Sequence, residues 1–346
     1  MAALLAILKA LRRAMARDLE SLASIKVNNL FLFVALLAYG ALNSGQPPRS
    51  AEGFFILLGF LLLFPLSSDP LGRIPPARLA LWPLTGRQRL VLRLASLALS
   101  PVAWIGVMIL LRTARPIAAL AFCALAAAMQ GALALGRSMV RRSRHWDLLR
   151  AIPPLPGRLG GLVRYNLREI LSVMDPYAAL AIAAGGAGYR FFGAHPDPEA
   201  FAIIGLLVAL TMSTYAQSLF GLDLGPGMTR YRLLPLAGWE ILLAKDAAFL
   251  AVLMVTLLPL DPAPGITLGL AALAIGHHSS VLMELPHQRW RFTGGRLMPV
   301  GAIQAMGGMA LGFVEHQRGP AVLAATAAAY AVSVWWYGRR WETKVG

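Results

Sequence analysis

The sequence predicts an all-helical integral membrane protein, with about ten transmembrane helices arranged in two parallel halves. Three observations support this fold class. Hydrophobic residues make up 58% of the 346 residues, whereas charged residues make up only 14%, against about a quarter in soluble domains. The apolar residues gather in ten separate segments. Two short polar turns of similar sequence lie 152 residues apart, which indicates an internal repeat.

The chain begins with a stretch that predicts an amphipathic helix on a membrane surface. Its apolar residues recur at helical spacing and its basic residues occupy other faces, the pattern of an interfacial helix. The apolar residues are Leu4, Leu8, Leu11, Met15, Leu19 and Leu22. A second such helix includes "YNLREILS" at Tyr165, which resembles "RDLESLAS" at Arg17, 148 residues earlier. Each predicted half therefore opens with a surface helix.

Ten apolar segments are the candidate spans, since about 20 residues cross the hydrocarbon core. They are 27–43, 53–67, 91–111, 116–136, 176–194, 199–221, 242–260, 265–283, 297–314 and 320–337. Four precede and six follow an Arg- and Pro-rich stretch that predicts a basic cytoplasmic linker. We therefore expect a first transmembrane half at 1–136, the linker at 137–161, and a second half at 162–346.

The basic residues predict the orientation of the chain. If the N-terminus is cytoplasmic, 27 of the 32 lysines and arginines fall on the inner side. The outer side keeps Arg49, Arg112, Arg115, Arg190 and Arg318. This asymmetry follows the positive-inside rule. We expect a multi-pass protein of a prokaryotic cytoplasmic (inner) membrane with both termini inside. Its net charge of +16 then serves orientation among membrane lipids, and we expect no nucleic-acid partner.

The two polar turns read "RLALWPLTG" from Arg78 and "RYRLLPLAG" from Arg230. Each has an Arg five residues before a Pro-Leu-x-Gly motif. The equivalent residues are Arg78 and Arg230, Pro83 and Pro235, Leu84 and Leu236, and Gly86 and Gly238. Pro and Gly favour a tight turn, and Glu240 follows where a helix dipole favours a carboxylate. A plain inter-helix loop is the alternative, which the duplication makes less attractive.

The stretch "FGLDLGPGMTRYRLLPLAGWEILLAKDAAFLAVLM", from Phe220 to Met254, resembles the second-to-third-span region of type-2 ATP-binding cassette (ABC) exporter permeases. That resemblance implies that the turn residues and Glu240 couple the chain to a separate ABC-type ATPase subunit. Such permeases usually have six spans and one such turn, whereas this sequence predicts ten and two. One chain could therefore engage two ATPase subunits, or it could pair with a second permease copy.

The chain lacks the P-loop signature, because none of its four lysines precedes Ser or Thr. We therefore expect a transport subunit without enzymatic activity of its own and without a resident cofactor. ATP and Mg are expected only in the partner subunit. The expected substrate is hydrophobic or amphipathic, and it is moved by alternating access.

Two other functions are compatible with the residues. An ion-coupled or passive transporter is the first, although carboxylates at membrane depth are scarce, Asp246 being the deepest. An intramembrane metalloenzyme using His277 or His278, with Glu284 and His287 nearby, is the second. The H-E-x-x-H signature is absent, and we expect no metal site. Polar side chains that could line a path, or bond helices together, are Gln130, Ser213, Thr214, Tyr215, Gln217, His277 and His278.

Overall fold

The computed structural model describes most of the second half of the chain and short pieces of the first. The described residues are 5–13, 26–27, 29, 81–82, 84–98, 111, 124, 153, 155–193, 195–223, 228, 230–231, 233–283, 285, 287, 289 and 292–345. The chain divides into two compact units, Met1–Ile25 with Phe31–Asp147, and Lys26–Leu30 with Leu148–Gly346. The boundary at 147–148 lies within the linker predicted at 137–161. The first four predicted spans lie largely outside the described residues.

The described part of the first unit is helical. Residues 5–13 form a helix in which Ile7 and Leu11 are buried, within the stretch predicted as a surface helix. Helix α5, Gly86–Ala98, begins at the glycine of the first polar turn. It buries Leu92 and exposes apolar residues such as Val91. The sequence after the first turn therefore forms a helix, as predicted.

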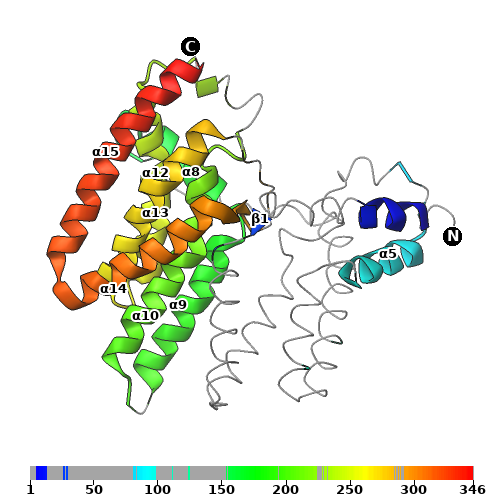
Figure 1. The fold of residues 1–346 in the computed structure, drawn as a ribbon, viewed down its shortest axis with the longest axis horizontal. Helices are drawn as coiled ribbons and strands as arrows, with labels where there is room; N and C mark the ends of the chain where they lie inside the picture. Colours follow the sequence, from blue (N-terminus) through cyan, green and yellow to red (C-terminus); the bar gives the residue numbers. More distant parts are fainter. Residues whose placement is uncertain are drawn as a thin grey trace. The chain divides into compact units, whose positions relative to one another are not determined.

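The second unit is a helical bundle (Figure 1). Its helices are α8 (Gly160–Ile170), α9 (Asp175–Phe192), α10 (Pro198–Ser213), α12 (Gly238–Leu257), α13 (Pro262–Leu282), α14 (Gly308–Arg318) and α15 (Pro320–Val345). The 3-10 helix η4, Thr214–Ser218, continues α10. Every apolar segment predicted after residue 175 coincides with helical structure, because long apolar runs bounded by Pro, Gly and Asp residues mark these segments.

Several of these helices are long and apolar enough to cross a membrane. Within the described residues, Pro198–Ser218, Pro262–Leu282 and Pro320–Thr343 qualify, and the bent pair α8–α9 makes a fourth if it counts as one span. Helix α12 is 20 residues long and carries the charged residues Glu240, Lys245 and Asp246. The described chain is thus helical with three to four candidate spans, which is compatible with a membrane protein.

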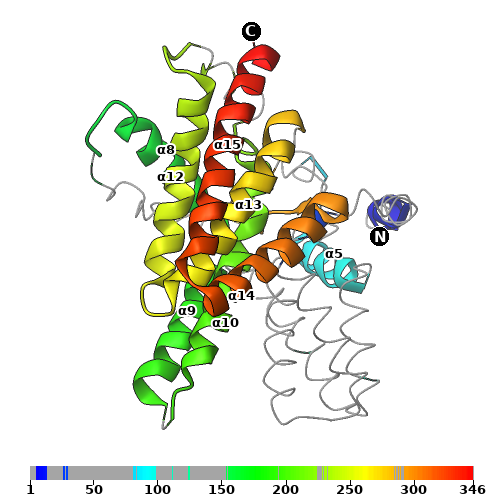
Figure 2. The same cartoon turned by 60° about the vertical axis from the view of Figure 1, so that its left-hand side comes forward.

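Helix α13 lies at the centre of the second unit. It packs against α10, α12, α14 and α15, as Figures 1 and 2 show. The most apolar windows of α10 and α13 are each 72% buried, against 17% for α15. Helix α15 is therefore the most peripheral of the three candidate spans.

Close approach of α13 to η4 depends on a small residue, because a Cβ on Gly276 would overlap the backbone of Ala216.

The helix predicted at the membrane surface before the second half is α8, which meets α9 at an angle of 77°. The bend is fixed by tertiary bonds. Tyr177 donates its hydroxyl hydrogen to the carbonyl of Leu171 at 2.8 Å. At the start of α9, the Asp175 carboxylate accepts bonds from the amide and hydroxyl of Thr293 at 3.0 and 2.7 Å. Helix α8 itself packs against α12.

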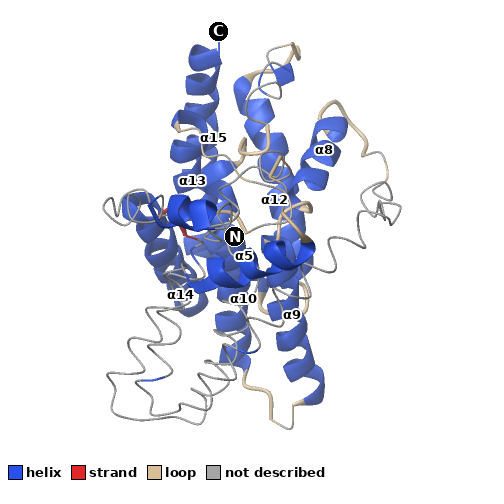
Figure 3. Cartoon of the chain, turned by 90° about the vertical axis from the view of Figure 1, so that its right-hand side faces the viewer, coloured by secondary structure: helices blue, strands red, loops and turns tan. Residues whose placement is uncertain are grey.

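The chain before α14 is irregular. Strand β1 (Lys26–Val27) pairs antiparallel with β2 (Gly295–Arg296), the short red segments of Figure 3. Two π-helical turns follow, η5 (Leu297–Gly301) and η6 (Ile303–Gly307). Wider π turns re-aim side chains, and they are often found at functional positions. Gln304 in η6 is fully buried. The apolar segment predicted at 297–314 is thus a helix with a widened first half.

Candidate functional site

The second polar turn joins the end of η4 to the start of α12. Within it, the amide of Leu236 donates to the carbonyl of Leu234 at 2.8 Å across Pro235. Helix α12 begins at Gly238, and the carboxylate of Glu240 accepts a bond from the amide of Ala237 at 2.8 Å. A side chain that reaches back to the N-cap amide is half of a capping box. The turn therefore fixes the direction in which α12 leaves it.

The first polar turn has the same local geometry. The amide of Leu84 donates to the carbonyl of Trp82 at 2.7 Å, and α5 begins at Gly86. The amide of Thr85 donates to the side-chain oxygen of Gln88 at 3.0 Å, as the amide of Ala237 donates to Glu240. Gln88 and Glu240 are 152 residues apart, so the correspondence of the motifs extends to their capping bonds.

The two turns also expose apolar side chains at equivalent positions. Leu81 is 82% exposed and Leu233 is 81% exposed. The next residues, Trp82 and Leu234, are 40% and 39% exposed. Paired large apolar side chains at the tip of a short polar loop are unfavourable in water. The two turns therefore share this pattern of exposure as well as their capping bonds.

A polar contact supports the second turn from the side of α8. Arg158 donates to the carbonyl of Pro235 at 2.6 Å and pairs with Glu240 at 3.3 Å. The Arg158 side chain is 65% exposed, so this pair contributes little energy and mainly orients Glu240. An open hollow of about 590 Å³ lies beside it, lined by 155–160, Val163 and Glu240. Glu240, which follows the second turn, thus forms part of the wall of this hollow.

Gly238 has a packing role in addition to its place in the turn. A Cβ at this position would overlap the carbonyl of Gly338 on α15, whereas a Cβ on Gly86 would meet no atom of the described residues within 4 Å. The amide of Gly238 also donates to the carboxylate of Glu342. The two glycines are therefore equivalent in the turn but not in their surroundings.

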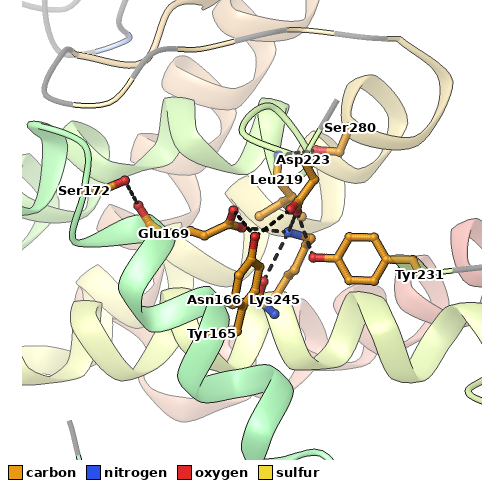
Figure 4. A network of polar contacts seen from close by, with 9 residues as sticks. All are labelled: Tyr165, Asn166, Glu169, Ser172, Leu219, Asp223, Tyr231, Lys245 and Ser280. Atoms are coloured by element: carbon orange, nitrogen blue, oxygen red, sulfur yellow. Dashed lines mark hydrogen bonds and ion pairs between the residues drawn. The ribbon is translucent and has the colours of Figure 1, made fainter. Parts of the chain in front are cut away.

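Below the second turn, a buried ionic cluster joins four segments of the chain (Figure 4). Lys245 of α12 donates to Asp223 at 2.6 Å, to Asn166 at 3.2 Å and to Glu169 at 3.4 Å. The Tyr231 hydroxyl donates to Asp223 at 2.8 Å. The side chains of Lys245, Glu169 and Asp223 are at most 3% exposed. This ionic cluster connects α8, the segment after η4, the turn and α12.

The electrostatics of the cluster depend on the Lys245 ammonium. It faces two carboxylates, and the rings of Phe220 and Tyr231 lie 4.9 and 5.3 Å from it. Burial alone would raise the pKa of Asp223, but Lys245 lowers that pKa below its ordinary value. Burial, together with the charge of Asp223, raises the pKa of Tyr231, so Tyr231 remains a hydrogen-bond donor. A buried pair of this kind fixes geometry more than it adds stability.

The polar residues predicted as path-lining in and after α10 are buried. Ser213, Thr214, Tyr215 and Gln217 are all at most 3% exposed. Asn29 bonds Thr214, Ser213 and Gln304, and Gln304 also accepts a bond from Gln217 at 2.8 Å. In this conformation these side chains bond neighbouring segments to one another. Asn29 and Gln304, which complete the cluster, carried no recognisable signal in the sequence.

The two adjacent histidines both contact α15. His277 is fully buried, with Ser333 at 2.9 Å from Nδ1 and Asp246 at 3.1 Å from Nε2. His278 lies 3.2 Å from the hydroxyl of Tyr337. Within the described part of the chain, no three His, Cys, Asp or Glu side chains are grouped so as to hold a metal ion.

The remaining predicted site residues differ in placement. Arg230 is exposed, and Leu236 is half-buried behind Pro235. Leu84 is buried, with 7% of its surface exposed. Arg78, Pro83, Gln130 and Glu284 lie outside the described residues. Sequence reasoning missed Arg158 and the ionic cluster, whose members come from distant positions; the adjacent charges of Lys245 and Asp246 within an apolar run were the available signal.

No protein family, curated protein or solved structure that was compared with the chain matches it.

Proposed function

We propose that this chain is the membrane-spanning permease subunit of a type-2 ABC exporter. A separate ATPase subunit, which binds ATP and Mg, drives it, and it moves a hydrophobic or amphipathic substrate by alternating access. The observation that carries this proposal is the pair of turns, which share an i-to-i+2 bond, a capping side chain and an exposed apolar pair at equivalent positions.

The exposed residues define where the ATPase docks. Leu81 and Trp82 on one turn, and Leu233 and Leu234 on the other, present apolar surface next to basic sequence. These apolar side chains lie on polar loops and not on a helix that faces lipid. Exposed apolar surface at such a position is typical of a protein interface. Arg230 adds an exposed positive charge that suits an acidic partner surface. One permease chain then engages two ATPase subunits.

The ionic cluster explains how movement of the second turn reaches the bundle. Tyr231 precedes the tip of the turn and bonds Asp223, which in turn bonds Lys245 on α12. Glu169 and Asn166 extend the same cluster to α8. Because these bonds are buried, they hold α8, the turn and α12 as one rigid piece. A displacement of the turn by the ATPase then moves α8 and α12 together.

The same proposal includes a membrane topology. The chain has ten spans in a 4 + 6 parallel repeat, in a prokaryotic cytoplasmic membrane, with both turns and both termini on the cytoplasmic side. The distribution of lysine and arginine supports this orientation. In the second unit, the loop joining α9 to α10 lies at the end opposite to the C-terminus (Figure 1), as an odd number of crossings between them requires.

Site-specific photo-crosslinking in native membranes tests the docking proposal. A photoreactive phenylalanine analogue at Leu81 or Leu233 should form adducts with a protein that contains a nucleotide-binding P-loop. The matched control is Phe192, which is 89% exposed and is the last residue of α9, at the end of the second unit opposite to the C-terminus (Figure 1). Adducts with the ATPase at Phe192, or none at Leu81 and Leu233, would contradict the proposal.

A further inference from the structure

A second polar cluster lies inside the bundle, between α12, α13 and α15. Its centre is the pair of Asp246 and His277, whose side chains are 0% exposed. Nε2 of His277 is 3.1 Å from Oδ2 of Asp246, and its Nδ1 is 2.9 Å from Oγ of Ser333. The Tyr330 hydroxyl donates to Oδ2 of Asp246 at 3.0 Å. Because a carboxylate and an imidazole are buried together here, the positions of their protons determine the charge of the cluster.

The hydrogen bonds determine where most of the hydrogens lie. Ser333 donates its hydroxyl hydrogen to the carbonyl of Ala274 at 2.8 Å. A hydroxyl has one hydrogen, so with that hydrogen directed at the Ala274 carbonyl, Ser333 accepts the bond from Nδ1 of His277, and Nδ1 carries a hydrogen. The other ring nitrogen faces a carboxylate. Two lone pairs at that distance repel each other, so a second hydrogen lies between Nε2 and Asp246.

We propose that Asp246 and His277 form a proton-binding site within the bundle. The pair holds a hydrogen at Nδ1 and a proton between Nε2 and the carboxylate, and it is electrically neutral as a whole. Without that proton, a buried carboxylate would carry an uncompensated negative charge, which is strongly unfavourable in a low-dielectric interior. The site goes beyond the proposed export function, because ATP-driven transport requires no proton.

The charged and titratable groups around the pair have other partners. On α12, Lys245 turns to Asp223, at 2.6 Å. On α13, His278 contacts Tyr337. From α15, the rings of Tyr330 and Tyr337 lie 6.0 and 6.3 Å from the ring of His277, and they are neutral. The charge of the Asp246 carboxylate is therefore balanced within the pair.

The site is linked to the position of α15. This helix supplies both Tyr330 and Ser333, yet only 17% of its apolar window is buried. If α15 moves away, Asp246 loses a donor and Nδ1 of His277 loses its acceptor. Any movement that changes proton affinity is in turn favoured or opposed by the proton, by thermodynamic linkage. Proton binding and the seating of α15 against α12 and α13 thus stabilise each other.

Nitrogen-15 NMR of the full chain in nanodiscs, with labelled histidine, tests the site directly. The chain has 6 histidines, and His277→Gln identifies the signals of His277. Wild-type His277 should show a bound hydrogen on Nδ1, and either a bound hydrogen or a strong hydrogen bond at Nε2. His278→Gln is the matched control on the same helix, and it should leave these signals in place. A wild-type His277 without hydrogen on Nδ1 would overturn the proposal.

The variant Asp246→Asn separates a proton site from a packing role. The amide keeps the shape and can donate to Nε2, but it does not ionise, so it supplies no negative charge to hold a second proton on the pair. His277 should become neutral, with a hydrogen on Nδ1 only. Unchanged Nε2 signals in this variant would contradict the shared proton. If Asp246→Asn does not fold, Ser333→Ala serves instead: it should shift the Nδ1 signal and leave Nε2 unchanged, and the reverse result would refute the assignment.

Discussion

Two consecutive residues of α12 enter two different buried clusters. Side chains of adjacent helical residues point about 100° apart, so Lys245 reaches Asp223 and α8, whereas Asp246 reaches His277 and α15. Helix α12 is therefore fixed on two sides by charge pairs rather than by apolar contacts alone.

Replacing Lys245 by Met should destabilise the second unit by about 3–5 kcal/mol, because Asp223 and Glu169 are left buried without their cation. The variant with Lys245→Met, Asp223→Asn and Glu169→Gln should recover most of that loss, since it removes both unpaired charges. Chemical unfolding of the purified protein in detergent measures both. Equal destabilisation of the single and triple variants would show that packing, not charge, is the cause.

Replacing Glu240 by Ala should remove the bond to the amide of Ala237 and lower the free energy of unfolding by about 1 kcal/mol. Glu240→Gln is the matched control, because Gln88 makes the equivalent bond in the first turn. It should retain nearly all the stability, although it loses the ion pair with Arg158. A loss in Glu240→Gln as large as in the alanine variant would assign the effect to that ion pair.

The residues that build the second turn could be predicted from the sequence, because a turn is made of neighbours in the chain. Pro235, Gly238 and Glu240 belong to such a turn in the structure, and their role in coupling stays a prediction. The partners of Lys245 could not be found, because Glu169 and Asp223 lie far away in sequence and only the packing of α8 on α12 brings them together. Buried polar clusters of this kind depend on tertiary structure that periodicity does not record.

At the scale of the element, the two polar turns are equivalent in backbone but different in packing. Gly86 starts a helix with no described residue close to its α-carbon hydrogens, whereas Gly238 starts one against the backbone of α15. The glycine occurs in both turns, but only in the second turn is the lack of a side chain also needed for close contact with α15. A substitution at Gly86 can therefore test docking, whereas a substitution at Gly238 tests folding.

Replacing Gly238 by Ala should destabilise the protein by about 1–3 kcal/mol, because its Cβ would overlap Gly338 of α15. Gly86→Ala should leave stability unchanged or slightly increased, since no atom of the described part of the chain lies within 4 Å of the added Cβ. Thermal unfolding of the two variants in the same detergent gives the comparison. A loss of stability at Gly86 equal to that at Gly238 would contradict the packing difference.

The element boundaries in the second half were largely predictable. The apolar segments at 176–194 and 265–283 match α9 and α13 to within about three residues, because Pro and Asp mark their starts. The 77° bend between α8 and α9 and the π turns before α14 were not predicted. Both depend on contacts with distant segments, such as the bond between Asp175 and Thr293.

At the scale of the whole molecule, the proposed topology places the second turn and the α9–α10 loop on opposite sides of the membrane. In a background without Cys123, His195→Cys should react with a membrane-impermeant maleimide added to intact cells. Leu233→Cys should react only after permeabilisation. Both positions are exposed in the structure, so accessibility within the protein does not limit labelling. Labelling of Leu233→Cys in intact cells would invert the orientation.

The central claim is that two turns of one chain dock on a separate ATPase, and the ATPase content of the purified complex tests it most directly. Affinity purification from native membranes should recover a P-loop ATPase with two copies per permease chain. The double variant Leu81→Asp and Leu233→Asp should lose it while remaining folded, because both side chains are more than four-fifths exposed. A complex without any ATPase, or an ATPase retained equally by the double variant, would contradict the account.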